Sequence, residues 1–453
     1  MSRQYFGTDG VRGRVGEPPM TAEFALRLGR AAGVVLGGAS ARPKVLIGKD
    51  TRVSGYMLES ALEAGLSAAG ADVCLLGPLP TPAVAFLTRS QRAQAGIVIS
   101  ASHNPFEDNG IKFFSAEGEK LDDALETAIE AELERPFTSV APMALGKATR
   151  LGDAQGRYLE FLKSRLSSNL APVRGLRLVV DAAHGAAYRV GPRLFEELGF
   201  QVHAIGVEPN GFNINDRCGA TDLSSLRAEV QRLGADLGIA VDGDADRLML
   251  VSGNGRSIDG DDVLYLLACH RRRRGQDPGP VVGTVMTNLG IEKALGMAGL
   301  RFERAAVGDR YVHQRLKECG GVLGGEASGH LLALDLASTG DGLLSALLAL
   351  EVLADTGQDL ERLLAGVHRY PQRTINVRVQ GAAKAVLATA AVAAARRDAE
   401  ARLGERGRVI LRASGTEPLL RVTVEAEDAA LLEQALTPLA AAVQAAAGSA
   451  HHS

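Results

Sequence analysis

The chain has 453 residues, with 50 Lys and Arg against 53 Asp and Glu and with 46% hydrophobic residues. This near-neutral balance argues against a dedicated nucleic-acid binder or a membrane-surface protein. No stretch reaches the roughly 18 apolar residues of a membrane span. The four cysteines form no CxxC pair and suit reduced core thiols. We therefore expect a cytoplasmic protein with no nucleic-acid or membrane partner, divided at roughly 100–200 residues per domain into three or four domains.

Short apolar runs alternate with longer helical patterns through most of the chain. Each run followed by a polar turn and a helix predicts one α/β unit. The predicted strands lie at 45–47, 178–180 and 281–285, and the helices that follow them lie at 56–69, 190–198 and 290–298. Pro, Gly and charged residues predict a linker at 135–150, and residues 252–255 predict a turn that ends the second unit or joins two strands.

The rhythm changes after residue 371, where a smaller α+β tail is predicted. Its expected elements are a strand at 374–379, an alanine-rich helix at 382–403, strands at 409–411 and 420–425, and a helix at 428–446. The sequence therefore predicts three α/β units followed by a distinct C-terminal unit.

A buried-strand pattern at 96–99 ends in the polar segment Ser100-Ala101-Ser102-His103-Asn104-Pro105. Polar residues at the carboxyl end of such a strand occupy the usual ligand position of an open α/β sheet. Ser102 is not expected to share a hydrogen bond with His103, because neighbours in an extended segment point to opposite faces. The G-x-S-x-G elbow is also missing. Ser102 needs another route of activation, such as phosphorylation with a metal, although the segment alone is equally typical of a polar turn.

Three carboxylates, Asp242, Asp244 and Asp246, alternate with small residues between two apolar runs. In an extended loop they fall on one side, where their repulsion requires a cation. Oxygen-only ligands favour Mg²⁺. An EF-hand is excluded because Arg247 and Gly253 stand where its Gly and Glu are required, and zinc is excluded because no His or Cys lies nearby. A solvated acidic turn is the alternative, but it leaves acids between buried strands without a partner.

A third polar segment follows the strand predicted at 409–411 and contains a Ser-Gly-Thr turn. Its backbone N–H groups and hydroxyls can bind phosphate oxygens, and Arg412 and Arg421 can add charge-assisted contacts. The Walker A order is missing, and a plain β-turn also explains the segment.

Glu326 and Ser328 form a fourth pair, which lies on one side of an extended loop and suits vicinal hydroxyls. A polar surface loop is the alternative for this pair alone. The glycine-rich clusters at 7–13 and 307–311 are uninformative singly. Together, a candidate phosphoserine, a carboxylate cage, a hydroxyl binder and a phosphate turn describe a phosphoryl-transfer site.

With these motifs in this order, the sequence resembles the α-D-phosphohexomutase family over essentially its whole length. The six motifs that carry the resemblance lie at 6–13, 100–105, 242–247, 307–312, 325–330 and 412–421. The resemblance implies three similar α/β domains with mixed sheets plus a C-terminal α+β domain, arranged as four domains around a central cleft. The expected bounds are 1–148 with the phosphoserine loop, 149–253 with the metal-binding loop, 254–368 with the sugar-binding loop, and 369–453 with the phosphate-binding turn.

The resemblance also implies a role for each matching residue. Ser102 would carry the phosphoryl group and join Asp242, Asp244 and Asp246 in holding Mg²⁺. The other catalytic residues would be Arg247, which stabilises the transferring group, and Arg12, Lys112 and His103, with His103 as an acid/base participant. Substrate would be bound by Glu326, Ser328, Asp309, Arg412, Ser414, Gly415, Thr416 and Arg421. The family often has Gln where Ala327 stands, and we expect little effect on hydroxyl binding because positions 326 and 328 are intact.

The activity implied is the interconversion of glucosamine 6-phosphate and glucosamine 1-phosphate through a phosphoserine enzyme and a 1,6-bisphosphate intermediate. It would feed the synthesis of UDP-N-acetylglucosamine and cell-wall precursors. The expected partners are the phosphorylated hexosamine and the bisphosphate, and the enzyme would be a monomer or homodimer. Three alternatives remain open: a phosphomannomutase/phosphoglucomutase of the same family, an aspartyl-phosphate sugar phosphatase, and a non-catalytic sugar-phosphate or metal-binding protein.

Overall fold

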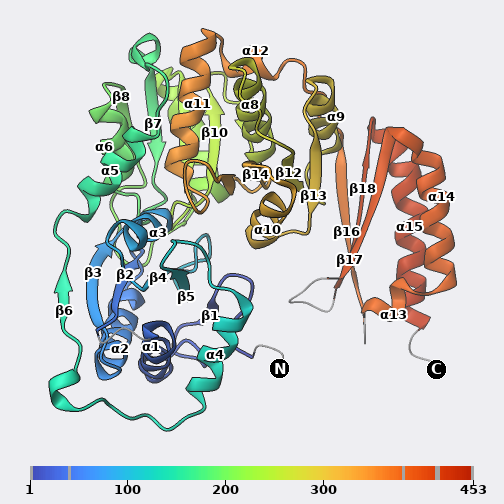
Figure 1. The fold of residues 1–453 in the computed structure, drawn as a ribbon. Coiled ribbons are helices and arrows are strands. Elements are labelled where there is room, and N and C mark those ends of the chain that lie inside the picture. Colours follow the sequence, from blue (N-terminus) through green and yellow to red (C-terminus); the bar gives the residue numbers. More distant parts are fainter. Residues whose placement is uncertain (1–3, 39–41, 380–382, 414–418, 450–453) are drawn as a thin grey trace. The chain divides into compact units, whose positions relative to one another are not determined.

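A computed structural model of the chain describes residues 4–38, 42–379, 383–413 and 419–449 (Figure 1). The chain divides into two compact units, one made of residues 1–284 and 303–364 and the other of residues 285–302 and 365–453. Among the residues described, every helix is too short or too polar to cross a membrane. The first unit contains three sheets and the second contains one.

The first sheet is mixed and ends one of its central strands at the serine segment. Its strands are β1 (Val11–Arg14), β2 (Lys44–Lys49), β3 (Asp72–Pro78), β4 (Ala95–Ile99), β5 (Asp108–Ser115) and β6 (Ala148–Arg150). Its helices are α1 (Ala22–Gly37), α2 (Ser54–Ala68), α3 (Thr81–Ser90) and α4 (Asp123–Leu133). The strand order is β1-β5-β4-β2-β3-β6, with β2 parallel to β3 and β4. Every residue of β4 is buried, so its carboxyl end delivers Ser102 directly from the core.

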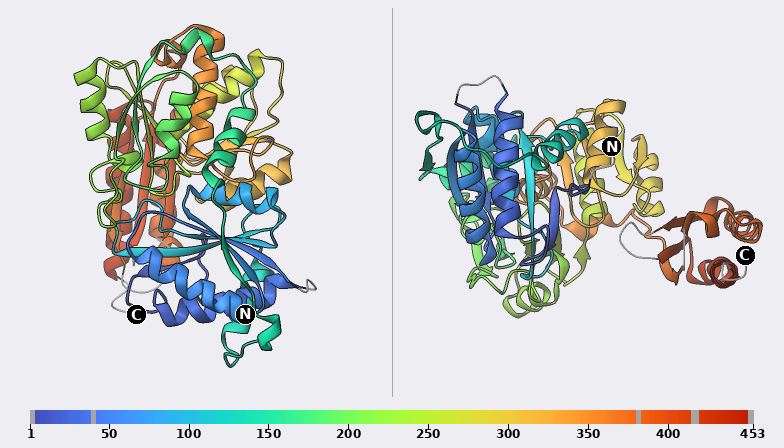
Figure 2. Two further views of the ribbon diagram at one scale, coloured as in Figure 1. Left: turned by 90° about the vertical axis from the view of Figure 1, so that its left-hand side faces the viewer. Right: turned by 90° about the horizontal axis from the view of Figure 1, so that it is seen from below.

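The prediction of a linker at 135–150 is wrong at its end. Strand β6 pairs in parallel with β3 and extends the first sheet. It has only three residues, two of which are exposed, so it lacks the apolar run by which the longer strands are found. On the same sheet, α1 and α2 pack side by side (Figure 2).

The second sheet carries the acidic loop on a hairpin. Its strands are β7 (Arg177–Asp181), β8 (Gln201–Ile205), β9 (Leu237–Val241), β10 (Leu248–Ser252) and β11 (Ser257–Ile258), and its helices are α5 (Ala154–Ser164), α6 (Val190–Glu197) and α7 (Ser224–Leu233). The order is β11-β10-β9-β7-β8. Strand β10 is antiparallel to both β9 and β11, so the predicted turn at 252–255 joins two strands. Residues 242–247 connect β9 to β10. The strand residues that flank this connection, Val241 and Leu248, are paired with each other.

The third sheet carries the Glu326 loop on a second hairpin. Its strands are β12 (Val281–Thr284), β13 (Phe302–Ala305), β14 (Leu323–Gly325) and β15 (Leu331–Ala333), in the order β13-β12-β14-β15. Its helices are α8 (Gly260–Arg273), α10 (Asp309–Cys319), α11 (Gly342–Thr356) and α12 (Leu360–Leu364). Asp341 caps α11 by accepting a hydrogen bond from the backbone N–H of Leu344, which satisfies one of the amides left without a helical partner.

The second unit is an antiparallel sheet with helices packed on it. Its strands are β16 (Gln372–Arg378), β17 (Gly407–Ala413) and β18 (Leu419–Ala426), and its helices are α9 (Leu289–Met297), α13 (Ala383–Leu387), α14 (Ala390–Leu403) and α15 (Ala429–Ser449). The order is β16-β18-β17, and α14 and α15 cover one face of the sheet (Figure 1). The predicted helix at 382–403 is interrupted because Thr389 accepts a hydrogen bond from the N–H of Val392 and starts a new helix.

Candidate active site

Ser102 lies in a tight loop after β4 and is almost completely buried. Its φ of 53° is in the left-handed region, which non-glycine residues adopt rarely. Two side chains hold the Ser102 carbonyl: Arg52 donates from Nη2 at 3.2 Å and Asn215 donates from Nδ2 at 2.9 Å. The backbone N–H of Ser102 donates to Ser100 Oγ at 3.0 Å. Both polar backbone groups of Ser102, its N–H and its carbonyl, are therefore hydrogen-bonded. The Ser102 hydroxyl donates to Asp242.

His103 lies closer to Ser102 than the sequence predicted. Its Nδ1 is 3.5 Å from Ser102 Oγ, because the left-handed turn at Ser102 breaks the extended geometry that would point the two side chains apart. Burial, together with the charges of Arg247 and Arg12, lowers the pKa of His103 to about 4. A neutral imidazole therefore stands beside the serine at physiological pH and can accept a proton.

The three acidic residues converge as predicted. Asp242, Asp244 and Asp246 are buried, and one carboxylate oxygen of each lies within 4.8 Å of the others. Their path is a turn and not an extended strand, since the N–H of Ala245 donates to the Asp242 carbonyl at 3.0 Å and Ala245 has a φ of 58°. Burial and the neighbouring carboxylates of Asp246 and Asp244 raise the pKa of Asp242 to about 7. Like charges held this close favour a bound cation.

Two atoms of this cluster fit the coordination of a divalent metal. Within the described part of the chain, Oδ1 of Asp244 is buried and accepts no hydrogen bond, and Oδ1 of Asp246 is buried with only longer contacts, 3.6 Å to His330 and 3.8 Å to Arg247. A buried carboxylate oxygen without a donor is costly, and a hard cation such as Mg²⁺ takes such oxygens as ligands. The donor set of the three aspartates therefore fits a divalent metal.

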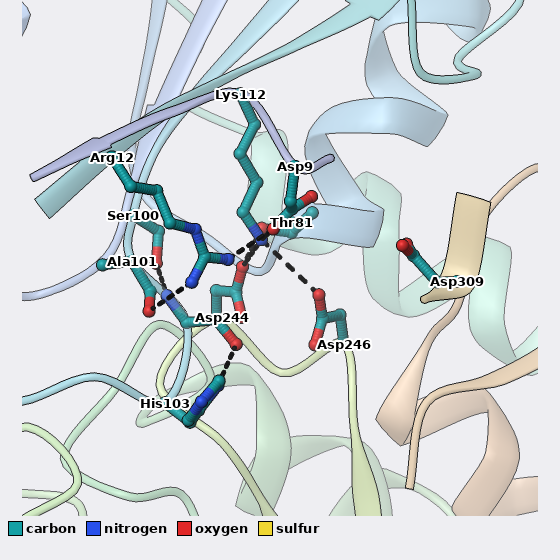
Figure 3. A network of polar contacts seen from close by, with 12 residues as sticks. Asp9, Arg12, Thr81, Ser100, Ala101, His103, Lys112, Asp244, Asp246 and Asp309 are labelled. Carbon is teal, nitrogen blue, oxygen red and sulfur yellow. Dashed lines mark hydrogen bonds and ion pairs between the residues drawn. The ribbon is translucent and has the colours of Figure 1, made fainter. Parts of the chain in front are cut away.

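Cationic side chains surround the acidic cluster (Figure 3). Lys112 Nζ lies 2.8 Å from Asp244, 3.1 Å from Asp9 and 3.6 Å from Asp246. Burial opposes the charge of Lys112, but the three carboxylates raise its pKa above the usual value. Arg12 pairs with Asp9 and lies near the Ala101 carbonyl at 3.4 Å.

Arg247 closes the other side of the acidic cluster. Its Nε lies 3.9 Å from Asp242 and 3.8 Å from Asp246, and its backbone N–H donates to Asp242 at 3.3 Å. The predicted catalytic residues thus lie around Ser102 and the acidic cluster next to it.

The predicted sugar-binding residues line a cavity that Ser102 also lines and that has a volume of about 630 Å³. The cavity is lined by Ser102, His103, Arg12, Asp246, Arg247, Asp309, Glu326, Ser328 and His330, among others. Glu326 accepts a hydrogen bond from the N–H of Gly308 at 2.9 Å, so one of its carboxylate oxygens is oriented by the loop that precedes α10. Carboxylate and hydroxyl groups facing a polar cavity suit a sugar ring.

Three residues of the site were not identified from the sequence. Asp9 pairs with Arg12, Lys112 and Lys120, and Lys120 also lies 2.6 Å from Asp309. His330 lies 3.4 Å from Asp309 and 3.6 Å from Asp246. Burial opposes protonation of His330, but these two carboxylates raise its pKa to about 9. His330 could have been identified from the sequence, because Glu326, Ser328 and His330 are two residues apart, as the three aspartates are.

The predicted phosphate-binding arginines lie in the second unit. Arg412 on β17 and Arg421 on β18 are directly opposite each other in the sheet. Together with Thr374, Asn376 and Thr423 they line a cavity of about 380 Å³. Two guanidinium groups at one cavity, with hydroxyl and amide side chains beside them, suit an anion. Ser414, Gly415 and Thr416 lie outside the described residues.

Known proteins share both the sequence and the fold. The chain matches the phosphoglucomutase/phosphomannomutase alpha/beta/alpha domain I at residues 3–138, domain II at 156–255, domain III at 259–370 and the C-terminal domain at 375–441. Phosphoglucosamine mutase of Xylella fastidiosa (strain M12) is 59% identical over 99% of this chain and 100% of that protein. Phosphoglucosamine mutase of Xanthomonas campestris pv. campestris (strain B100) is 58% identical over 98% and 100%.

Solved structures agree with these matches. A phosphoglucomutase/phosphomannomutase family protein from Burkholderia thailandensis aligns with a TM-score of 0.82 and 26% identity over 98% of both chains. Aspergillus fumigatus N-acetylphosphoglucosamine mutase, in complex with GlcNAc-6P and magnesium, shares the fold with a TM-score of 0.66 and 18% identity over 98% of this chain and 96% of that one. Matches to all four domains, near-complete coverage by relatives and a site built around Ser102 show that the chain belongs to the phosphoglucomutase/phosphomannomutase family of phosphohexomutases.

Proposed function

We propose that the enzyme interconverts glucosamine 6-phosphate and glucosamine 1-phosphate, and so feeds UDP-N-acetylglucosamine and cell-wall precursor synthesis. The observation that carries the mechanism is the contact between the Ser102 hydroxyl and Asp242, within a buried acidic cluster and next to Arg247. The choice of an amino sugar rests on relatives named phosphoglucosamine mutase that are 57–59% identical over almost the whole chain. We further propose the domain bounds 1–148, 149–253, 254–368 and 369–453.

The reaction begins with a phosphoryl group on Ser102. The bond from phosphorus to Ser102 Oγ breaks while a bond to the C1 oxygen of glucosamine 6-phosphate forms, and neutral His103 accepts the proton of that hydroxyl. The resulting 1,6-bisphosphate reorients in the site. The Ser102 Oγ left deprotonated by the first transfer then attacks the phosphoryl group at C6, and the bond from that phosphorus to the C6 oxygen breaks. The C6 oxygen takes the proton back from His103, which leaves glucosamine 1-phosphate and restores the phosphoenzyme and the neutral imidazole.

Charge on the transferring group is the main demand of this chemistry. Arg247 lies beside the acidic cluster and can offset that charge. Arg12 on β1 and Lys112 on β5 add positive charge near the same cluster. Asp242, Asp244 and Asp246 would hold Mg²⁺ with a phosphoserine oxygen, and the bound metal would stabilise charge on the phosphoryl oxygens. Arg412 and Arg421, with Ser414, Gly415 and Thr416, would hold the phosphate that does not react. Glu326, Ser328 and Asp309 would bind the sugar.

Other properties follow from the same proposal. All four cysteines are free thiols, as expected in the reducing cytoplasm, and we place the enzyme there as a monomer or homodimer. The amine at C2 distinguishes glucosamine from glucose and mannose, so selectivity for it separates this proposal from a phosphomannomutase/phosphoglucomutase.

The test combines the substrate panel with the state of Ser102. The wild-type enzyme should turn over glucosamine 6-phosphate faster than the glucose and mannose phosphates, and its Ser102 peptide should carry acid-stable phosphate by mass spectrometry. Ser102→Ala should lose at least about 10³-fold in kcat, because the covalent relay is removed. Normal turnover by Ser102→Ala, or acid-labile phosphate on Asp242 or Asp244 in its place, would refute the mechanism.

A further inference from the structure

Helix α3 begins against the acidic loop of the second sheet. Thr81, its first residue, is almost fully buried. Its backbone N–H donates to the Asp244 carbonyl at 2.9 Å, and its hydroxyl donates to Asp244 Oδ2 at 2.6 Å (Figure 3). The first N–H groups of a helix have no partner within it, so the Asp244 carbonyl supplies the hydrogen-bond acceptor for the N–H of Thr81. One residue of the first sheet's helices therefore holds both the main chain and the side chain of a predicted metal ligand.

The two oxygens of Asp244 have different surroundings. Oδ2 accepts hydrogen bonds from Thr81 and from Lys112 Nζ, the latter at 2.8 Å. Oδ1 is buried and accepts none from the residues that the structure describes. With Oδ2 occupied by two donors, Oδ1 is the oxygen that remains for a cation.

Lys112 alone does not fix this orientation. Its ammonium group also lies 3.1 Å from Asp9 and 3.6 Å from Asp246, so three carboxylates share it. An ammonium on a four-carbon stem attracts carboxylates as a point charge with little directional preference. Among the described residues, the Thr81 hydroxyl donates to Asp244 alone, and its short, β-branched side chain has few rotamers. The directional contact therefore comes from Thr81.

We propose that Thr81 is a positioning residue for the metal site, which orients Asp244 so that Oδ1 faces the cation while Oδ2 stays bound to protein donors. The inference rests on the metal-dependent mechanism proposed above. Side chains that orient a metal ligand typically contribute 10- to 100-fold in metal affinity. Thr81 touches neither the phosphoryl group nor the sugar in this scheme, so its effect passes through Asp244.

The experiment measures metal affinity directly, by Mn²⁺ titration followed by electron paramagnetic resonance and by Mg²⁺ calorimetry. Thr81→Val keeps the shape and removes the hydroxyl, whereas Thr81→Ser keeps the hydroxyl. The matched control is Thr88→Val, a second buried threonine of α3 whose hydroxyl donates only within the helix, to the Val84 carbonyl. Thr81→Ala serves as a second deletion of the hydroxyl if the valine variant does not fold.

Thr81→Val should bind both metals roughly 10- to 100-fold more weakly, while Thr81→Ser and Thr88→Val should stay within about twofold of wild type. The activity of Thr81→Val should need a correspondingly higher Mg²⁺ concentration, with kcat largely restored at saturation. Unchanged metal affinity in Thr81→Val, equal losses in Thr81→Val and Thr81→Ser, or an equal loss in Thr88→Val would overturn the inference. A wild type that binds metal with this dependence on Thr81 but does not isomerise hexosamine phosphates would refute the proposed function alone.

Discussion

Single carboxylates in the first unit are buried in two different ways. Asp244 and Asp246 are surrounded by cations, whereas Asp341 has mainly neutral partners, the hydroxyl of Tyr158 at 2.8 Å and the N–H of Leu344 at 2.9 Å. Burial therefore raises the pKa of Asp341 from 3.8 to about 6. Ionised carboxylates without a cationic partner destabilise a folded protein, so the cost of Asp341 depends on pH.

The first prediction concerns that pH dependence. Because the pKa of Asp341 is higher in the folded than in the unfolded state, the folded state binds more protons between pH 4 and pH 6, and stability falls as pH rises through that window. Asp341→Asn keeps a helix-capping side chain and removes the titration. Its apparent melting temperature should rise relative to wild type between pH 4 and pH 7, by the equivalent of up to about 3 kcal/mol.

Asp355 provides a control of opposite sign for this prediction. Burial opposes the charge of Asp355, but its hydrogen bonds from His270 and Ser168 lower its pKa. Asp355→Asn should therefore lose stability relative to wild type as pH rises toward the ordinary carboxyl pKa of 3.8, and the difference should stay constant above it. A constant difference between Asp341→Asn and wild type from pH 4 to pH 7 would show that Asp341 does not titrate in this range.

Among the helices, α1 and α2 pack at a crossing that requires glycine. A Cβ atom on Gly65 would lie 2.1 Å from the Leu26 carbonyl oxygen and 2.7 Å from the Arg30 nitrogen, and one on Gly29 would lie 2.6 Å from the Leu62 carbonyl oxygen. These neighbours are backbone atoms and cannot turn aside. A glycine in a helix costs backbone conformational entropy, but at these two positions it allows the two helix backbones to approach each other.

A pair of alanine substitutions tests this packing. Gly65→Ala should destabilise the protein by about 1–3 kcal/mol, because it overpacks the crossing. Gly156→Ala, in the first turn of α5 with no described atom within 4 Å of the added Cβ, should stabilise it by up to about 0.5–1 kcal/mol. Thermal denaturation measures both. Equal effects of the two substitutions would mean that helix propensity, and not backbone contact, governs position 65.

The elements show where prediction from sequence succeeds and where it stops. Apolar runs and helical periodicity predicted β2, β7 and β12 with the helices after them, because burial imposes those periods. Strand β6 was missed because its three residues are mostly exposed. The acidic cluster was found because its members are near neighbours in sequence. Thr81 was not found, because its contact with Asp244 spans 163 residues, and residue spacing carries no information about contacts at that separation.

At the scale of the whole molecule, the chain consists of two compact units with separate cores. The predicted metal ligands all lie in the first unit, and the paired arginines Arg412 and Arg421 lie in the second. Ligands that bind one unit should therefore stabilise that unit selectively, and core mutations should act on the unit that contains them.

Calorimetry of the full chain should resolve this division. Leu436→Ala removes a fully buried side chain of α15 and should lower the transition of the second unit by the equivalent of about 2–5 kcal/mol. Mg²⁺ at about 100 times its Kd should raise the transition of the first unit by the equivalent of about 2.7 kcal/mol. A single transition shifted by both changes would contradict independent unfolding of the units.

The loop that carries Ser102 has a consequence for domain exchange between relatives. Its backbone is held by Arg52 from the first sheet and by Asn215 from the second, and the Thr51 hydroxyl donates to the His184 carbonyl at 2.5 Å. Two of these contacts, from Asn215 to Ser102 and from Thr51 to His184, join polar groups of the first sheet's loops to those of the second. A chimera that takes its first two domains from different parents inherits an unmatched set of donors and acceptors. Transplanting the first two domains together keeps these contacts, and exchanging one of them alone puts the contacts at risk.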